Sequence, residues 1–94
     1  MYKRQAARNV GLYTLSALKE ELGSLDKVER IIRTFGMVNS APGFSEHPKV
    51  IDGFSNLMIE VFGEAGRGAR SAIGMSSLPF NIAVEVEMTV KLVD

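Results

Sequence analysis

The segment Val84-Glu85-Val86-Glu87-Met88-Thr89-Val90-Lys91-Leu92 decides the fold class, because apolar and polar side chains alternate along it without interruption. Successive side chains of a β-strand point to opposite faces of a sheet, so the alternation predicts a strand with one apolar and one polar face. Such a strand requires neighbouring strands and a second layer that covers its apolar face. Earlier segments of the chain must supply both.

Two earlier segments are candidates for the neighbouring strands. Residues 26–38 carry apolar side chains at both odd and even positions, which is typical of an interior strand covered on both faces. Residues 69–75 form a shorter candidate, and a turn-forming run at residues 78–81 separates it from residues 84–92. We therefore expect the last two strands to pair as a hairpin about Leu78.

Two segments have the spacing of amphipathic helices. In residues 5–22, apolar or small side chains recur every three or four positions, and Gly23 can end a helix in the left-handed conformation. Apolar side chains repeat in the same way from Val50 to Val61, before a glycine-rich stretch at residues 63–66. The chain thus reads α-β-α-β-β, and the predicted fold is α+β, with two helices on one face of a mixed sheet.

Two features of the predicted fold, an uncovered sheet face and a first helix without an N-cap, indicate an incomplete domain. A sheet covered on one face only leaves apolar surface exposed, so we expect the chain to associate with further copies. Residues 1–6 offer the first helix no Ser, Thr, Asp or Asn as an N-cap, and residues 2–5 resemble the translated tail of a sequencing adapter. We expect residues 1–94 to form a single domain in which residues 1–5 are non-native.

Composition excludes several classes of function. Eleven basic and eleven acidic side chains cancel, so the chain lacks the positive charge expected of a dedicated nucleic-acid binder. The absence of cysteine excludes disulfides, thiolate metal sites and a cysteine nucleophile. The apolar runs are far shorter than the ~20 residues that a membrane span needs. We expect a soluble, cytoplasmic domain.

Two apparent motifs receive structural interpretations. The glycine-rich residues 63–71 lack the Lys-Ser/Thr pair that ends a phosphate-binding loop, and they lead into a strand rather than into the N-terminus of a helix. They are interpreted as a helix stop and a turn. His47 is the single histidine and has no recognisable metal-ligand or triad partners, so we interpret it as an exposed loop side chain without a catalytic role.

Arg70 and Glu85 are the candidates for chemistry. A hairpin about Leu78 sets them opposite each other on adjacent strands, where the guanidinium can hold a substrate carboxylate while the acid positions a water. The alternative is a cross-strand salt bridge on a solvated face, which contributes about 0.2–1 kcal/mol. Spacing alone favours the salt bridge.

The run from Ala69-Arg70-Ser71-Ala72 through Leu78-Pro79 to Val84-Glu85-Val86-Glu87 resembles the signature of the RidA/YjgF family, whose members are also called L-PSP endoribonuclease-like. Upstream, Leu25-Asp26-Lys27-Val28 and the positions Asn56, Glu60 and Phe62 resemble family positions too. Residues 36–44, Gly-Met-Val-Asn-Ser-Ala-Pro-Gly-Phe, are similar to those of a less characterised branch.

The resemblance implies a chorismate-mutase-like α+β fold and a homotrimer with clefts between subunits. It also implies hydrolysis of reactive enamines and imines to 2-keto acids and ammonia, with no metal and no organic cofactor. Arg70 would hold the carboxylate of a small anionic metabolite, backbone groups near Ala72 would assist, and Glu85 would orient the attacking water. Asn56 corresponds to a family position near the cleft.

Three departures from the family pattern limit this transfer. Ala72 stands where many members have cysteine, Gly68 stands where proline is common, and the strands that precede the first helix in the family are missing from this chain. Two other functions therefore stay open. One is a trimer that binds a small metabolite without catalysis. The other, in third place, is an endoribonuclease, against which the neutral charge and the lack of clustered basic and aromatic residues argue.

Overall fold

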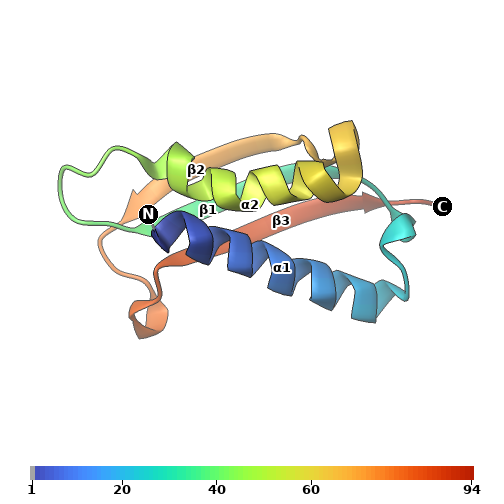
Figure 1. Ribbon diagram of the computed structural model, residues 1–94, viewed down its shortest axis with the longest axis horizontal. Coiled ribbons are helices and arrows are strands. Elements are labelled where there is room, and N and C mark those ends of the chain that lie inside the picture. The colour runs from blue at the N-terminus through green and yellow to red at the C-terminus, as the bar shows by residue number, and fades with distance from the viewer. Residues whose placement is uncertain (1) are drawn as a thin grey trace.

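The computed structural model describes residues 2–94 as two long helices, three strands and short 3-10 turns between them (Figure 1). The elements are α1 (Tyr2–Leu22), β1 (Val28–Asn39), α2 (His47–Phe62), β2 (Ala69–Met75) and β3 (Val84–Leu92). This order is the predicted α-β-α-β-β.

The sheet has the strand order β2-β1-β3, so β1 is the central strand (Figure 1). β1 runs parallel to β2 and antiparallel to β3. The predicted hairpin between the last two strands is therefore wrong. The α2 helix connects the end of β1 to the start of β2, so that β1-α2-β2 is a parallel crossover unit. β3 pairs with the other edge of β1.

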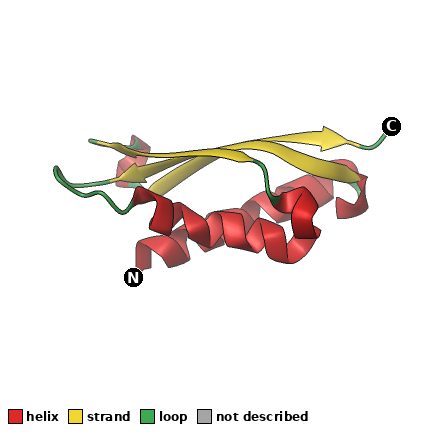
Figure 2. Ribbon diagram, turned by 90° about the horizontal axis from the view of Figure 1, so that it is seen from above, coloured by secondary structure: helices red, strands yellow, loops and turns green. Residues whose placement is uncertain are grey.

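Both helices lie on one face of the sheet, as Figure 2 shows, and this confirms the α+β prediction. The core fills the space between the layers, and six of its large side chains are fully buried, namely Ile31, Val38, Val50, Ile51, Phe54 and Met58. These side chains come from β1 and α2. The predicted cover on both faces of β1 is found on the helix side only, because no helix of the described residues lies over the other face.

The helix ends follow from local sequence. Gly23, with a φ of 85°, follows α1 and donates its N–H to the Lys19 carbonyl at 2.8 Å. α2 begins at His47, three residues before the predicted Val50, with Pro48 in its first turn. Proline is favoured there because the first helical N–H groups have no partner within the helix.

The other face of the sheet has no helix over it in the part of the chain that is described (Figure 2). Val84 and Val86 of β3 pack against the core, so Glu85 between them points to the uncovered face. Ile73 of β2 lies opposite Met37 of β1 on that face and is 40% exposed. No helix in the described residues is long and apolar enough to cross a membrane.

Candidate active site

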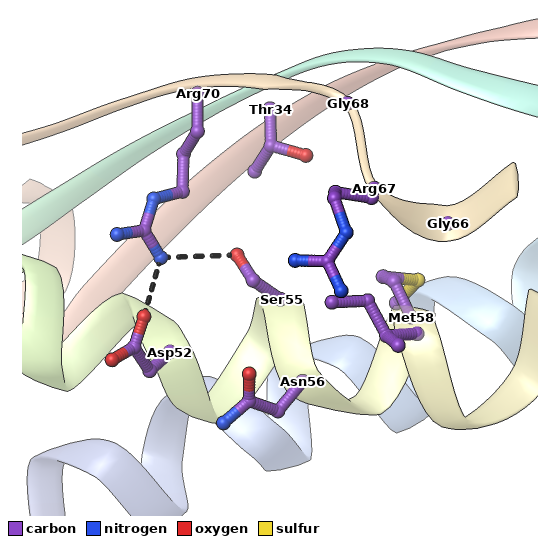
Figure 3. Close-up of a pocket in the computed structure, with 10 residues that line it drawn as sticks. Thr34, Asp52, Ser55, Asn56, Met58, Gly66, Arg67, Gly68 and Arg70 are labelled. Atoms are coloured by element: carbon purple, nitrogen blue, oxygen red, sulfur yellow. Dashed lines mark hydrogen bonds and ion pairs between the residues drawn. The ribbon is translucent and has the colours of Figure 1, made fainter. Parts of the chain in front are cut away.

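Arg70 is the second residue of β2, and its side chain lies on the helix side of the sheet (Figure 3). Its register partner on β1 is Thr34. Nη1 of Arg70 donates to Oδ1 of Asp52 at 2.7 Å and to Oγ of Ser55 at 3.3 Å. Asp52 and Ser55 are three positions apart on α2 and so share one side of that helix.

One edge of the Arg70 guanidinium remains open. Both contacts use Nη1, and no hydrogen bond within residues 2–94 involves Nε or Nη2. Figure 3 shows that edge turned away from Ser55 and Arg67. The side chain is 27% exposed. A guanidinium edge that offers two parallel N–H groups to solvent matches the geometry of a carboxylate.

A cavity of about 230 Å³ adjoins Arg70 on its inner side, between α2, β2 and the segment that connects them. Asn56 lines this cavity four positions after Asp52 on the same helix. The structure thus brings together Arg70 and Asn56, two of the residues predicted for the site. Arg67 also lines the cavity and is paired with Glu64 at 3.2 Å.

Ala72 lies two residues beyond Arg70 on the same face of β2. It is partly buried against the core, opposite Gly36 of β1. β2 is an edge strand of the sheet within the described residues, so one side of its backbone has no strand neighbour there. Ala72 does not line the cavity.

Within one subunit, the side chain of Glu85 lies far from that of Arg70. Glu85 pairs in register with Met37 and points to the uncovered face, whereas Arg70 points to the helix side. β1 separates their two strands, which places the strand axes about 10 Å apart. The predicted cross-strand contact between Arg70 and Glu85 within one chain is therefore wrong, and so is the cross-strand salt bridge that was its alternative. Asp52 is the carboxylate that binds Arg70 instead.

His47 is also placed differently from its prediction. It is the first residue of α2 and is half-buried, with Nε2 at 3.4 Å from Oγ of Ser40 and its ring edge-on to Phe44. Within residues 2–94, no group of three or more His, Asp or Glu side chains lies close enough together to hold a metal ion.

The glycine-rich stretch has the structure that its sequence predicts. Gly63–Gly66 is a 3-10 turn at the end of α2, and the chain then enters β2. A Cβ on Gly68 would lie 2.7 Å from the Ile31 carbonyl oxygen, so this segment needs glycine to approach β1. The stretch therefore forms a wall of the cavity.

Sequence reasoning missed Asp52, Ser55, Thr34 and Arg67. Asp52, Ser55 and Asn56 have the i, i+3, i+4 spacing of one helix stripe, which is the only signal that links them in the sequence. A polar stripe usually faces water. That this one faces β2 depends on the strand order, which the sequence does not reveal.

Comparison with known proteins decides the family. The family model “YjgF/chorismate mutase-like, putative endoribonuclease” matches residues 2–92. The chain belongs to this family. The resemblance drawn from the residues around Arg70 is thereby confirmed, as is the chorismate-mutase-like fold.

Several known proteins are similar to this chain. Protein TCP17 of Trypanosoma cruzi is 46% identical over 88 residues, which make up 93% of this chain and 55% of TCP17. The crystal structure of Atu1372 from Agrobacterium tumefaciens, a protein of unknown function, is 44% identical with a TM-score of 0.92. A candidate endoribonuclease from Shewanella oneidensis is 34% identical with a TM-score of 0.90.

The chain spans between half and two thirds of the length of these relatives. It covers 55% of TCP17, 58% of the Agrobacterium protein and 60% of the Shewanella protein, while 93–96% of the chain itself is matched. The similarity therefore extends over both helices and all three described strands.

Proposed function

We propose that this YjgF-family protein hydrolyses reactive enamines and imines to 2-keto acids and ammonia. The observation that carries the proposal is the presentation of Arg70. Asp52 and Ser55 hold the guanidinium through Nη1, and the edge formed by Nε and Nη2 is left open. The substrates of this reaction are 2-imino acids, each with a planar carboxylate next to the reacting carbon.

Arginine suits this carboxylate better than a simple positive charge does. Two parallel N–H···O bonds fix both the position and the plane of the carboxylate, and a hydrogen bond to a charged group contributes about 1.5–3 kcal/mol. Because the imine carbon is bonded to the carboxylate carbon, fixing one also positions the other. We assign further contacts with the substrate to backbone groups near Ala72, two residues after Arg70 on β2, as the family resemblance implies.

The hydrolytic step needs an oriented water. The water oxygen attacks the imine carbon and one water proton passes to the nitrogen, which gives a carbinolamine. The second proton then moves from the new hydroxyl to the nitrogen as the C–N bond breaks, so that ammonia leaves and the 2-keto acid remains. We assign the orientation of this water to Glu85, as the family resemblance implies. Asn56, at the rim of the cavity, would contact the substrate.

Glu85 can serve the Arg70 site only if a second copy of the chain supplies it. Within one chain the two side chains point to opposite faces of the sheet. The uncovered face, with Ile73 at 40% exposure, is apolar surface that a further copy can cover. We therefore propose a homotrimer whose sites lie between subunits, with Arg70 from one copy and Glu85 from the next.

A coupled assay tests the proposal. An amino-acid dehydratase generates the enamine, and the release of 2-keto acid is followed with the full chain, with Arg70→Ala and with a matched control, Arg8→Ala. Arg8 forms an exposed ion pair with Glu60, so its loss should leave turnover unchanged. We expect acceleration by the wild type and by the control but not by Arg70→Ala. Equal acceleration by Arg70→Ala would refute the proposal.

Binding without turnover is the second candidate function. Asp52 is already engaged with Arg70 at 2.7 Å, and Glu85 points away from it, so a single chain offers a carboxylate-binding edge without a catalytic acid at that edge. Calorimetry with 2-keto acids separates the two functions. Tight binding without acceleration of imine hydrolysis would support the binding protein.

Endoribonuclease activity is the third candidate, because the family description and the Shewanella relative name it. The net charge of zero argues against a long polyanion as the main ligand. RNA cleavage that is lost in both Arg70→Ala and Glu85→Gln would favour this function. Cleavage that persists in the double variant would point to a contaminant or to another site.

A further inference from the structure

We infer that the cavity between β2 and α2 is a second anion subsite, separate from the open edge of Arg70. It takes the carboxylate or phosphate group of a small acidic ligand. The inference concerns binding alone, so it stands or falls independently of imine hydrolysis.

Thr34 is the first observation behind this subsite. Its side chain belongs to the central strand, is only 5% exposed and lines the cavity. Figure 3 shows the hydroxyl directed into the cavity. No buried side-chain oxygen or nitrogen among the described residues lacks a partner, so the Thr34 hydroxyl is not a stranded group but a donor and acceptor at the cavity wall that a polar ligand can engage.

Ser55 and Arg67 supply further donors on the opposite walls. Oγ of Ser55 accepts a bond from Arg70 and keeps its own proton to donate. Arg67 is held by Glu64 through Nε and Nη2, and these side chains are 61% and 83% exposed. An ion pair this exposed contributes about 0–1 kcal/mol, so a bound anion can readily compete for the guanidinium.

Size and charge restrict the ligand. The cavity holds about 230 Å³, which is below the ~300–1,000 Å³ of pockets that enclose drug-sized molecules. It therefore admits an acidic group rather than a nucleotide. Arg67 and Arg70 contribute two positive charges, and Asp52, whose Oδ1 binds Arg70, contributes one negative charge. Glu64, the exposed partner of Arg67, carries the second negative charge, so an anion is bound by replacing Glu64 at the Arg67 guanidinium.

Two neighbouring subsites define a class of ligand. A molecule with two acidic groups places one on the open edge of Arg70 and the other beside Thr34. A compound with a single carboxylate occupies the edge of Arg70 alone. The expected preference is for dicarboxylates, or for acids that also carry phosphate, over monocarboxylates of the same length.

Calorimetry on the full chain tests this inference with three probes: inorganic phosphate, succinate and propionate. The test variant is Thr34→Val, which keeps the side-chain shape and removes the hydroxyl. Its matched control is Thr89→Val, at an exposed position of β3. We expect phosphate and succinate to bind the wild type and the control equally, and Thr34→Val to weaken both about tenfold. Propionate binding should change less than twofold.

A second variant guards against misfolding of the first. Arg67→Gln leaves the core untouched, because Arg67 is exposed, and it should also weaken phosphate and succinate without changing propionate binding. The inference is overturned if the wild type binds neither phosphate nor succinate. It is equally overturned if Thr34→Val and Arg67→Gln bind them as tightly as Thr89→Val does.

Discussion

At the scale of single residues, the geometry of Arg70 matters more than its charge. A lysine at this position keeps the positive charge but cannot offer two parallel N–H groups to a carboxylate. We therefore expect Arg70→Lys to lower kcat/KM for imine hydrolysis at least about tenfold, the equivalent of one lost charge-assisted hydrogen bond. Steady-state kinetics check this, with Arg8→Lys as the control. An Arg70→Lys variant with full activity would show that charge alone suffices.

The sequence predicted which residues belong to the candidate site better than it predicted how they are arranged. The family signature around Arg70 and Glu85 identified both residues, and the family is confirmed. Their mutual position was predicted wrongly, because the register of β2 and β3 is set by β1, which lies between them. Asp52 was not predicted as a site residue, because the sequence does not indicate which strand α2 packs against.

At the scale of elements, the hydroxyl of Thr34 on β1 lines the cavity, and no buried side-chain oxygen or nitrogen among the described residues lacks a partner. Its role is to meet a ligand rather than to hold the sheet together. We therefore expect Thr34→Val to change the free energy of unfolding by no more than about 1 kcal/mol in either direction. Urea denaturation measures this change against Thr89→Val. A clear loss of stability in Thr34→Val would mean that the hydroxyl has a structural partner.

The contact between β1 and α2 depends on Gly36. A Cβ at this position would lie 2.7 Å from Cδ1 of Ile51, a fully buried side chain. We expect Gly36→Ala to destabilise the fold by about 1–3 kcal/mol through overpacking. Ile51→Val should recover part of this loss when combined with it, so the double variant is more stable than the two single effects predict. Strict additivity in urea denaturation would contradict a direct contact.

Elements were predicted well and their pairing poorly. The three-and-four spacing located both helices, and the alternation at Val84–Leu92 located β3, because each pattern reflects burial along its own element. Strand order depends on contacts between distant segments. The apolar character of β1 on both faces was the available sign of its central place, and it also argued against a simple hairpin.

At the scale of the whole molecule, the uncovered face of the sheet predicts association. Ile73 lies on that face at 40% exposure. If this face forms the interface of the proposed trimer, Ile73→Lys should shift the chain toward monomer, because a charge buried between copies would lose its hydration. Light scattering after size-exclusion chromatography measures the mass. Val93→Lys, at an exposed position after β3, is the control and should leave the trimer intact. An unchanged mass for Ile73→Lys would place the interface elsewhere.

Subunit complementation tests the central claim most directly, since it asks whether Arg70 and Glu85 act together from different copies. Arg70→Ala and Glu85→Gln chains are each assayed alone and after being refolded together in equal amounts. The account predicts that each variant is inactive and that the mixture regains about a quarter of wild-type imine hydrolysis, because one site in four then combines an intact Arg70 with an intact Glu85. A mixture no more active than either variant alone would contradict it.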